Sequence, residues 1–286
     1  MRSSEWLIAG YFLYVAVIAT WFFTPASPAT LKACGLAAVI IAIMFALARL
    51  PTRGVSYIRD IAPAIYALAA YREMNWFTPA VHAHRLEHIW IVWDRRILDG
   101  WHLRSAIESA GPLLAGFLEL CYTLVYAVAV VSMLAIYANR RRDRVNLFWL
   151  AYLTGTLGAY GLFPYFPSEP PRTVFRGEDM PHLTTVFREL NLFIVGGYGI
   201  HSSVFPSAHV SLVLSAAWGL LAAIPERRWI GWTMAAYGIL VAIATVYGRY
   251  HYAVDALAGI AVSFAALAVL AIALRYDRRS HASAAG

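Results

Sequence analysis

The chain has 286 residues, of which 60% are hydrophobic and only 14% are charged. A soluble domain is about half apolar and about one-quarter charged, so this composition excludes a soluble globular protein. The formal net charge of +7 comes from arginines that stand in short clusters between apolar blocks. Such clusters are typical of membrane topology signals and lipid head-group contacts, so no nucleic-acid partner is expected.

Seven apolar blocks approach the length of about 20 residues that a bilayer-spanning helix needs. They cover residues 6–23, 31–48, 112–138, 147–163, 209–224, 229–247 and 254–274. An eighth segment, 61–71, is short and contains Pro63, so it is a span, a re-entrant piece or an interfacial helix. Residues 75–110 carry tryptophans among charges, which predicts an interfacial helix with its aromatic side toward lipid.

Basic clusters predict the orientation, because cytoplasmic loops of membrane proteins carry an excess of Lys and Arg. The clusters lie at residues 140–144, 227–228 and 275–279. Two predicted spans separate each cluster from the next, so all three fit on the cytoplasmic side. The loop 164–208 and the turn 248–253 then lie together on the exoplasmic side. The basic residues near 2 and 49–53 fit the same scheme only if segment 61–71 supplies one more crossing.

The first segment that suggests chemistry is FPYFPSEPPRTVF, residues 163–175. Its four prolines make a stiff, non-helical stretch that leaves Arg172 little conformational freedom. An arginine held in this way is suited to binding phosphate through its planar fork of donors. A simple contact with lipid head groups would account for the same residue.

The second segment is VFPSAHVSLV, residues 204–213, where a loop enters an apolar helix. Ser207 is placed to cap that helix, and the free backbone N–H groups of a helix start favour an anion. His209 falls in the first turn and would face such an anion. The alternative is that Ser207 only caps the helix and His209 only anchors it at the interface.

The third segment is GRYHYAVDALAG, residues 248–259. His251 and Asp255 are four residues apart, so on a helix they share a face. The carboxylate would accept a hydrogen bond from one ring nitrogen and leave the other nitrogen free to attack. A purely structural His–Asp pair is the alternative.

Together the three segments predict phosphoryl transfer without a metal or cofactor. Arg172, Arg249 and backbone N–H groups would hold the phosphate oxygens and stabilise charge in the transition state. His251 would attack phosphorus, and His209 would protonate the departing oxygen. Further candidates for the pocket are Tyr165, His201 and Ser202. The spacing of His82, His84 and His88 could bind a metal, but no other residue supports such a site.

These segments resemble the type 2 phosphatidic acid phosphatase (PAP2) superfamily over about residues 146–265. The motifs FPxxPPR, FPSAH and RYHYAVD most resemble the branch that includes inositol phosphorylceramide synthases. The resemblance implies a six-helix membrane core, a phosphohistidine mechanism, no metal and lipid phosphate esters as substrates.

Position by position, the resemblance implies that His251 is the nucleophile and Asp255 the carboxylate that orients it. His209 matches the acid, Ser207 a phosphate-contacting serine, and Arg172 the arginine of the first motif. Two positions depart from the wider family: Tyr165 stands where a lysine is usual, and Thr245 where an arginine is usual. Both departures fit the synthase-like branch better than a general phosphatase.

We therefore expect an all-α polytopic membrane bundle with two parts. Residues 1–110 would hold N-terminal spans and an interfacial helix, and residues 111–280 a PAP2-like catalytic core. The expected activity is the transfer of phosphate or a phospho-head-group from a lipid to an alcohol or to water. The alternatives are a plain lipid or polyprenyl-phosphate phosphatase and a non-catalytic lipid-binding or transport protein. The expected location is a bacterial cell membrane with the active site on the periplasmic side, and the oligomeric state stays open.

Overall fold

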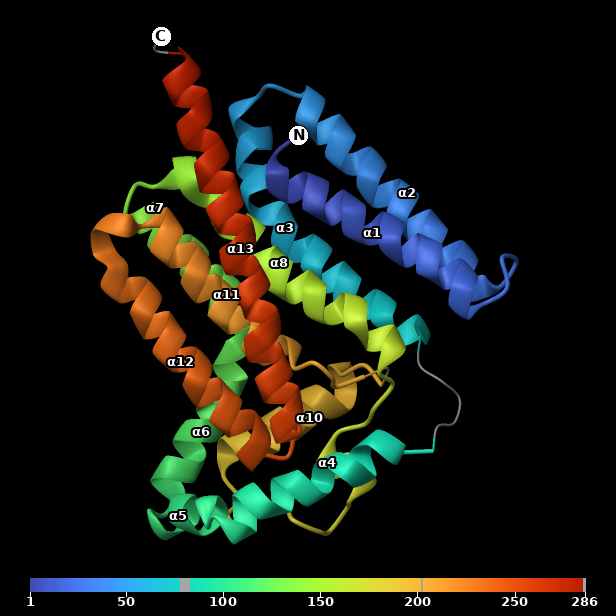
Figure 1. Ribbon diagram of the computed structural model, residues 1–286, viewed down its shortest axis with the longest axis vertical. Coiled ribbons are helices and arrows are strands. Elements are labelled where there is room, and N and C mark those ends of the chain that lie inside the picture. The colour runs from blue at the N-terminus through green and yellow to red at the C-terminus, as the bar shows by residue number, and fades with distance from the viewer. Residues whose placement is uncertain (78–82, 202, 285–286) are drawn as a thin grey trace.

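The computed structural model describes residues 1–77, 83–201 and 203–284, and the regular elements in these ranges are all helices (Figure 1). The predicted all-α polytopic bundle is therefore confirmed. His82 and Ser202 lie outside the described residues. The α-helices are α1 (Ser3–Phe22), α2 (Pro28–Arg49), α3 (Arg53–Glu73), α4 (Arg85–Arg95), α5 (Leu103–Ser109), α6 (Pro112–Leu124), α7 (Val128–Ala138), α8 (Val145–Leu162), α9 (Pro171–Val174), α10 (Val186–Tyr198), α11 (Ala208–Ala223), α12 (Arg228–Tyr247) and α13 (Ala253–Ala284).

Several helices are long and apolar enough to cross a bilayer, which makes the protein a multi-pass membrane protein. Within the described residues there are 5 of these helical stretches: Ser3–Phe22, Pro28–Arg49, Pro112–Ala138, Pro225–Tyr247 and Ala253–Tyr276. The predicted spans at 147–163 and 209–224 form α8 and α11, which are 18 and 16 residues long and do not belong to this group. Both are largely buried, so neighbouring helices rather than lipid surround them.

Helix α11 forms the centre of the bundle and packs against α8, α12 and α13. Its close approach to α8 depends on Gly155, because a Cβ atom at this position would overlap the Ser215 side chain. The Ser211 hydroxyl donates a hydrogen bond to the Gly155 carbonyl at 2.9 Å. A small residue at the contact therefore lets two helix backbones come together, as is common in membrane bundles.

Segment 61–71 belongs to the longer helix α3, which runs through Pro63 and packs against α8. Its 21 residues correspond to about 31 Å, which matches a hydrocarbon core of about 30 Å. The charged first half of α3 is neutralised inside the protein, since buried Asp60 pairs with Arg2 at 2.7 Å and Arg142 at 2.6 Å. Helix α3 is thus long enough to cross a bilayer, but it is not among the helices that are also apolar enough to do so.

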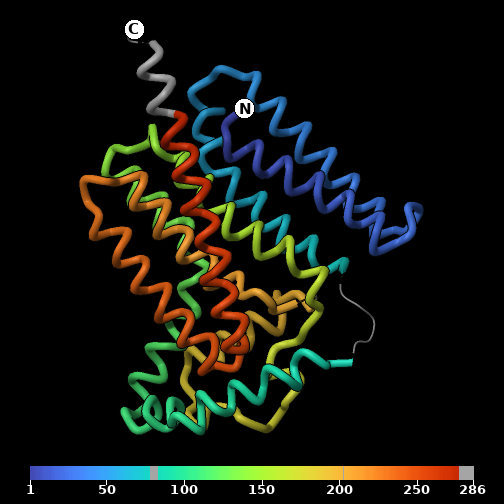
Figure 2. Tube along the Cα trace, viewed as in Figure 1, coloured from blue at the N-terminus to red at the C-terminus, as the bar shows by residue number. Residues whose placement is uncertain are grey.

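The basic clusters and the three motifs lie at opposite ends of the bundle. Arg141 forms an ion pair of 2.9 Å with Glu226, and Arg144 bonds the Ala222 carbonyl, so the first two clusters meet. The start of α1 lies at the same end as the turn between α11 and α12, whereas α4 and α5 form the other end (Figure 2). The predicted interfacial region forms α4 and α5, but Trp90 of α4 is buried against Phe205 instead of facing lipid.

Candidate active site

His209 and His251 meet at the end of the bundle opposite the basic clusters. His209 lies in the first turn of α11, and His251 lies in the turn between α12 and α13. The His209 Nδ1 and His251 Nε2 atoms are 3.2 Å apart. On the other side of the ring, His251 Nδ1 lies 3.3 Å from Asp255 Oδ2. The structure therefore brings together the three residues that the motifs single out.

Asp255 is held by the backbone around it. Its Oδ2 atom accepts a hydrogen bond of 2.9 Å from the Tyr252 N–H, and the side chain is fully buried. A carboxylate in this position favours the His251 tautomer with the proton on Nδ1. The His251 Nε2 atom is then an acceptor, and the His209 Nδ1–H donates to it.

Ser207 caps α11 and links it to α13. Its hydroxyl accepts from the Val210 N–H, and its own N–H donates to the Asp255 carbonyl at 2.9 Å. Gly259 allows this contact, since a Cβ atom there would lie 2.5 Å from the Ser207 carbonyl oxygen. The two helix starts that carry the histidines and the aspartate are therefore fixed against each other.

Arg172 is held beside the turn that carries His251. Its N–H donates to the Arg249 carbonyl at 3.3 Å, and its Nη1 donates to the Tyr250 carbonyl at 3.4 Å. Its guanidinium carbon lies 5.4 Å from the centre of the Tyr250 ring. Burial, together with the charges of His209 and Arg172, holds the pKa of His251 well below its ordinary value. A neutral His251 imidazole is the form that has a free electron pair.

Arg249 forms a buried ion pair with a residue of α4, and its predicted contact with phosphate stays a prediction. Its Nη1 donates to Asp94 Oδ2 of α4 at 2.6 Å, and both side chains are 1% exposed. Asp94 Oδ1 also accepts from the Ala253 N–H at 2.8 Å. The Arg249 side chain thus joins the turn to α4 and is engaged outside the histidine pair.

Tyr165 and His201 have contacts elsewhere in the described part of the chain. Tyr165 is about half exposed, and its hydroxyl accepts from that of Tyr14 at 3.2 Å while its ring contacts Phe22 of α1. His201 is exposed, and its backbone N–H donates to the side chain of Asn75. Ser202 is not among the described residues.

An apolar cavity of about 580 Å³ opens beside His209. It lies between α3, α7, α8, α10 and α11. Small and aromatic residues dominate its lining, with His209 at one wall. The aromatic side chains are Tyr71, Tyr126, Tyr152, Tyr160 and Tyr198. Its volume falls within the range of about 300–1,000 Å³ that is common for small-molecule sites.

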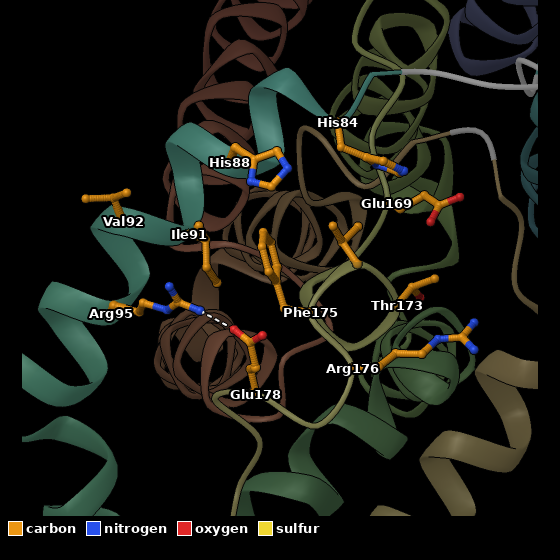
Figure 3. A pocket seen from close by; sticks show the side chains of 11 residues that line it. His84, His88, Ile91, Val92, Arg95, Glu169, Thr173, Phe175, Arg176 and Glu178 are labelled. Carbon is orange, nitrogen blue, oxygen red and sulfur yellow. Dashed lines mark hydrogen bonds and ion pairs between the residues drawn. The ribbon is translucent and has the colours of Figure 1, made fainter.

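A second cavity of about 800 Å³ lies between α4 and residues 169–178 (Figure 3). Its lining is mostly polar and includes His88, Arg95 and Glu178, and the last two form an ion pair of 2.6 Å. Neither His209 nor His251 lines it. Although larger, this cavity does not contain the residues that the motifs single out.

Two buried acidic residues that contact the neighbours of His251 were not identified from the sequence. Asp94 lies in α4 and Glu119 in α6, both outside the three motifs. Glu119 Oε2 accepts from the Tyr250 hydroxyl at 2.6 Å, next to His251 in the chain. An acidic residue within an apolar block was the only available signal for Glu119.

Comparison with known protein families identifies the family to which these motifs belong. The family model of the PAP2 superfamily matches residues 88–269, which is more than half of the chain. No curated protein and no solved structure matches the chain significantly. The match begins inside α4, so it covers this helix from residue 88 as well as the three motifs. The chain belongs to the PAP2 superfamily and is a multi-pass membrane enzyme of the lipid phosphatase type.

Proposed function

We propose that the protein transfers phosphate or a phospho-head-group from a membrane lipid to an alcohol or to water through a phosphohistidine at His251. The observation that carries this proposal is the position of His251 between Asp255 and His209, with contacts of 3.3 and 3.2 Å. Asp255 leaves the electron pair on Nε2, and His209 places a proton on the same side. This is the arrangement that a nucleophile and a general acid need.

In the first step, Nε2 of His251 attacks phosphorus and the bond from phosphorus to the lipid oxygen breaks. The departing oxygen takes the Nδ1 proton of His209, which acts in its imidazolium form and becomes neutral, and the N–P bond forms. In the second step, the acceptor hydroxyl attacks phosphorus and gives its proton to His209, while the N–P bond breaks. Arg172 would stabilise the phosphate oxygens in both steps, because its fork of donors lies beside the same turn. Ser207 would contribute a further phosphate contact at the start of α11.

The cavity beside His209 supports a lipid as the leaving group. His209 would protonate the leaving oxygen, so the hydrocarbon attached to that oxygen has to lie on the His209 side. The apolar cavity of about 580 Å³ has His209 in its wall. A membrane lipid phosphate ester would therefore place its chains in the cavity and its phosphate at His251 Nε2, where it would replace the direct contact between the two histidines.

The sequence departures favour transfer to an alcohol, as in the inositol phosphorylceramide synthase-like branch. Thr245 is buried, and its carbonyl accepts from the His251 N–H at 3.1 Å, so an uncharged residue supports the turn at this position. Tyr165 likewise brings no charge and contacts α1. The proposal places residues 111–280 as the catalytic core and its active-site end on the periplasmic face of a bacterial cell membrane.

The test is a product assay with purified protein in detergent. Phosphatidic acid, a polyprenyl diphosphate, and phosphatidylinositol with ceramide or diacylglycerol would be supplied, and free phosphate and new lipids would be followed together. A new phospholipid with little free phosphate establishes the transferase, and free phosphate alone establishes the phosphatase. His251→Ala should abolish either product, whereas His182→Ala, which removes an exposed histidine bonded to Glu108, should retain activity. Equal activity of His251→Ala and wild type would refute the proposal.

A further inference from the structure

The turn between α12 and α13 is bonded to two buried carboxylates from other parts of the chain. On one side, Asp94 of α4 accepts from Arg249 Nη1 at 2.6 Å and from the Ala253 N–H at 2.8 Å. These two donors flank His251 in the chain, two residues before it and two residues after it. A single carboxylate therefore bridges both ends of the segment that carries the proposed nucleophile.

On the other side, Glu119 of α6 accepts from the Tyr250 hydroxyl at 2.6 Å and from Arg188 Nη1 at 2.8 Å. Arg188 of α10 also donates to the Gly248 carbonyl at 3.3 Å. The Tyr250 ring stacks on Tyr122 at 4.0 Å between ring centres. Glu119 thus fixes the residue that immediately precedes His251, through both its hydroxyl and the packing of its ring.

Burial makes these contacts strong constraints on geometry. Asp94, Glu119 and Tyr250 are at most 2% exposed, and Arg188 is 5% exposed. Charge-assisted hydrogen bonds are stronger than neutral ones, and water that would compete with them is largely excluded. Arg249 adopts a left-handed backbone conformation with φ of 62°, which a non-glycine residue holds only when its surroundings determine it.

The same turn also positions Arg172. The carbonyl groups of Arg249 and Tyr250 accept from the N–H and Nη1 of Arg172. A shift of the turn would therefore displace both the attacking nitrogen and the cation that faces the phosphate. Both displacements act on the reaction step, because they change the geometry in which the reacting atoms meet.

We propose that Asp94 and Glu119 are positioning residues that hold the His251 turn and Arg172 in the geometry for phosphoryl transfer. This inference rests on the proposed function, since it takes His251 as the nucleophile. It assigns Arg249 a role through Asp94 instead of direct contact with phosphate. Neither carboxylate touches the substrate, so both act on the rate of the chemical step more than on lipid binding.

The test compares Asp94→Asn and Glu119→Gln with Asp60→Asn, all normalised to folded protein by thermal unfolding in detergent. Asp60 is a matched control, because it is also a buried carboxylate paired with arginines, but at the opposite end of the bundle. We expect kcat to fall about 100-fold in Asp94→Asn and Glu119→Gln, with KM within about twofold of wild type. Asp60→Asn should lose thermal stability and keep the kcat of its folded fraction.

The double variant D94L/R249M separates positioning from folding. Replacing both partners of a buried ion pair by apolar residues avoids the unpaired charge that the single change leaves. We expect this variant to unfold close to the wild-type temperature and still to show the reduced kcat. It also keeps the proposal testable if Asp94→Asn does not fold.

The outcomes distinguish this inference from the proposed function. If His251→Ala is inactive while folded Glu119→Gln and D94L/R249M keep a kcat within about twofold of wild type, the positioning role is refuted and the phosphohistidine proposal stands. If His251→Ala remains active, the proposed function itself fails. A fall in kcat of the same size in Asp60→Asn would also overturn the inference, because the effect would then follow from stability alone.

Discussion

His209 Nδ1 lies 3.2 Å from His251 Nε2, on the side of the His251 ring that faces away from Asp255. The nitrogen proposed to attack phosphorus and the nitrogen proposed to protonate the leaving oxygen therefore point at the same place. This separation leaves no room for phosphorus between the two nitrogens, so substrate binding has to replace their direct contact.

The role of His209 predicts a dependence on the leaving group. His209→Ala should lower kcat by about 10²- to 10⁴-fold with a natural lipid, because an alkoxide leaves slowly without a proton. With a p-nitrophenyl phosphate ester, whose leaving group needs no proton, the variant should recover most of the wild-type rate. The measurement is the ratio of kcat values for the two substrates. An equal loss with both would contradict a role as general acid.

The lowered pKa of His251 predicts how activity depends on pH. The imidazole attacks in its neutral form, which exists above its pKa. Because burial and the nearby charges lower that pKa, His251 should stay neutral well below the ordinary value of about 6.5. The kcat/KM profile of wild type should therefore show no loss from His251 protonation near pH 6.5. An acidic limb of the kcat/KM profile centred near pH 6.5 would contradict this prediction.

The cavity beside His209 predicts selectivity for the lipid chain. Ala129 of α7 lines the cavity, so Ala129→Phe should fill part of it and raise KM for a long-chain lipid phosphate about tenfold or more. A short-chain, water-soluble phosphate ester should be affected little. Val131→Phe, on an exposed position of the same helix, serves as the control. A rise in KM that is equal for both chain lengths would argue against this cavity as the chain site.

The orientation can be tested with single cysteines at the two ends of the bundle. The side chains of Glu178 and Glu226 are 63% and 57% exposed, at the motif end and the basic end respectively. In a background without Cys34 and Cys121, Glu178→Cys should react with a membrane-impermeant reagent added outside intact cells. Glu226→Cys should react only after the membrane is opened. The reverse pattern would place the active site in the cytoplasm.

The sequence predicted the local features of the site well, because they depend on short spacings. The predicted contact of His251 with Asp255 is present at 3.3 Å, although His251 lies in the turn before α13 and not on the helix itself. The predicted cap of Ser207 before an apolar helix is also present. The sequence also identified His209 as part of the first turn of that helix. Arg172 was grouped with these residues because the three segments were predicted to lie on the same side of the membrane.

Other features depend on contacts between distant parts of the chain and had no local pattern. Arg249 was assigned to phosphate because it is close to His251 in the chain, yet its partner is Asp94, 155 residues away. Segment 61–71 was predicted to be short and interrupted by Pro63, whereas helix α3 begins at Arg53 and runs through that proline. In the structure, Arg2 and Arg142 neutralise the Asp60 carboxylate, so the helix continues through the charged stretch.

The most direct test of the account is to trap the phosphoenzyme. Purified protein would be mixed with a lipid phosphate labelled on phosphorus, quenched under alkaline conditions that preserve phosphohistidine, and mapped by mass spectrometry. The phosphohistidine mechanism predicts one acid-labile phosphate or phospho-head-group on His251, formed at least as fast as turnover and absent from His251→Ala. Steady turnover without a modified His251, or a label on another residue, would contradict it.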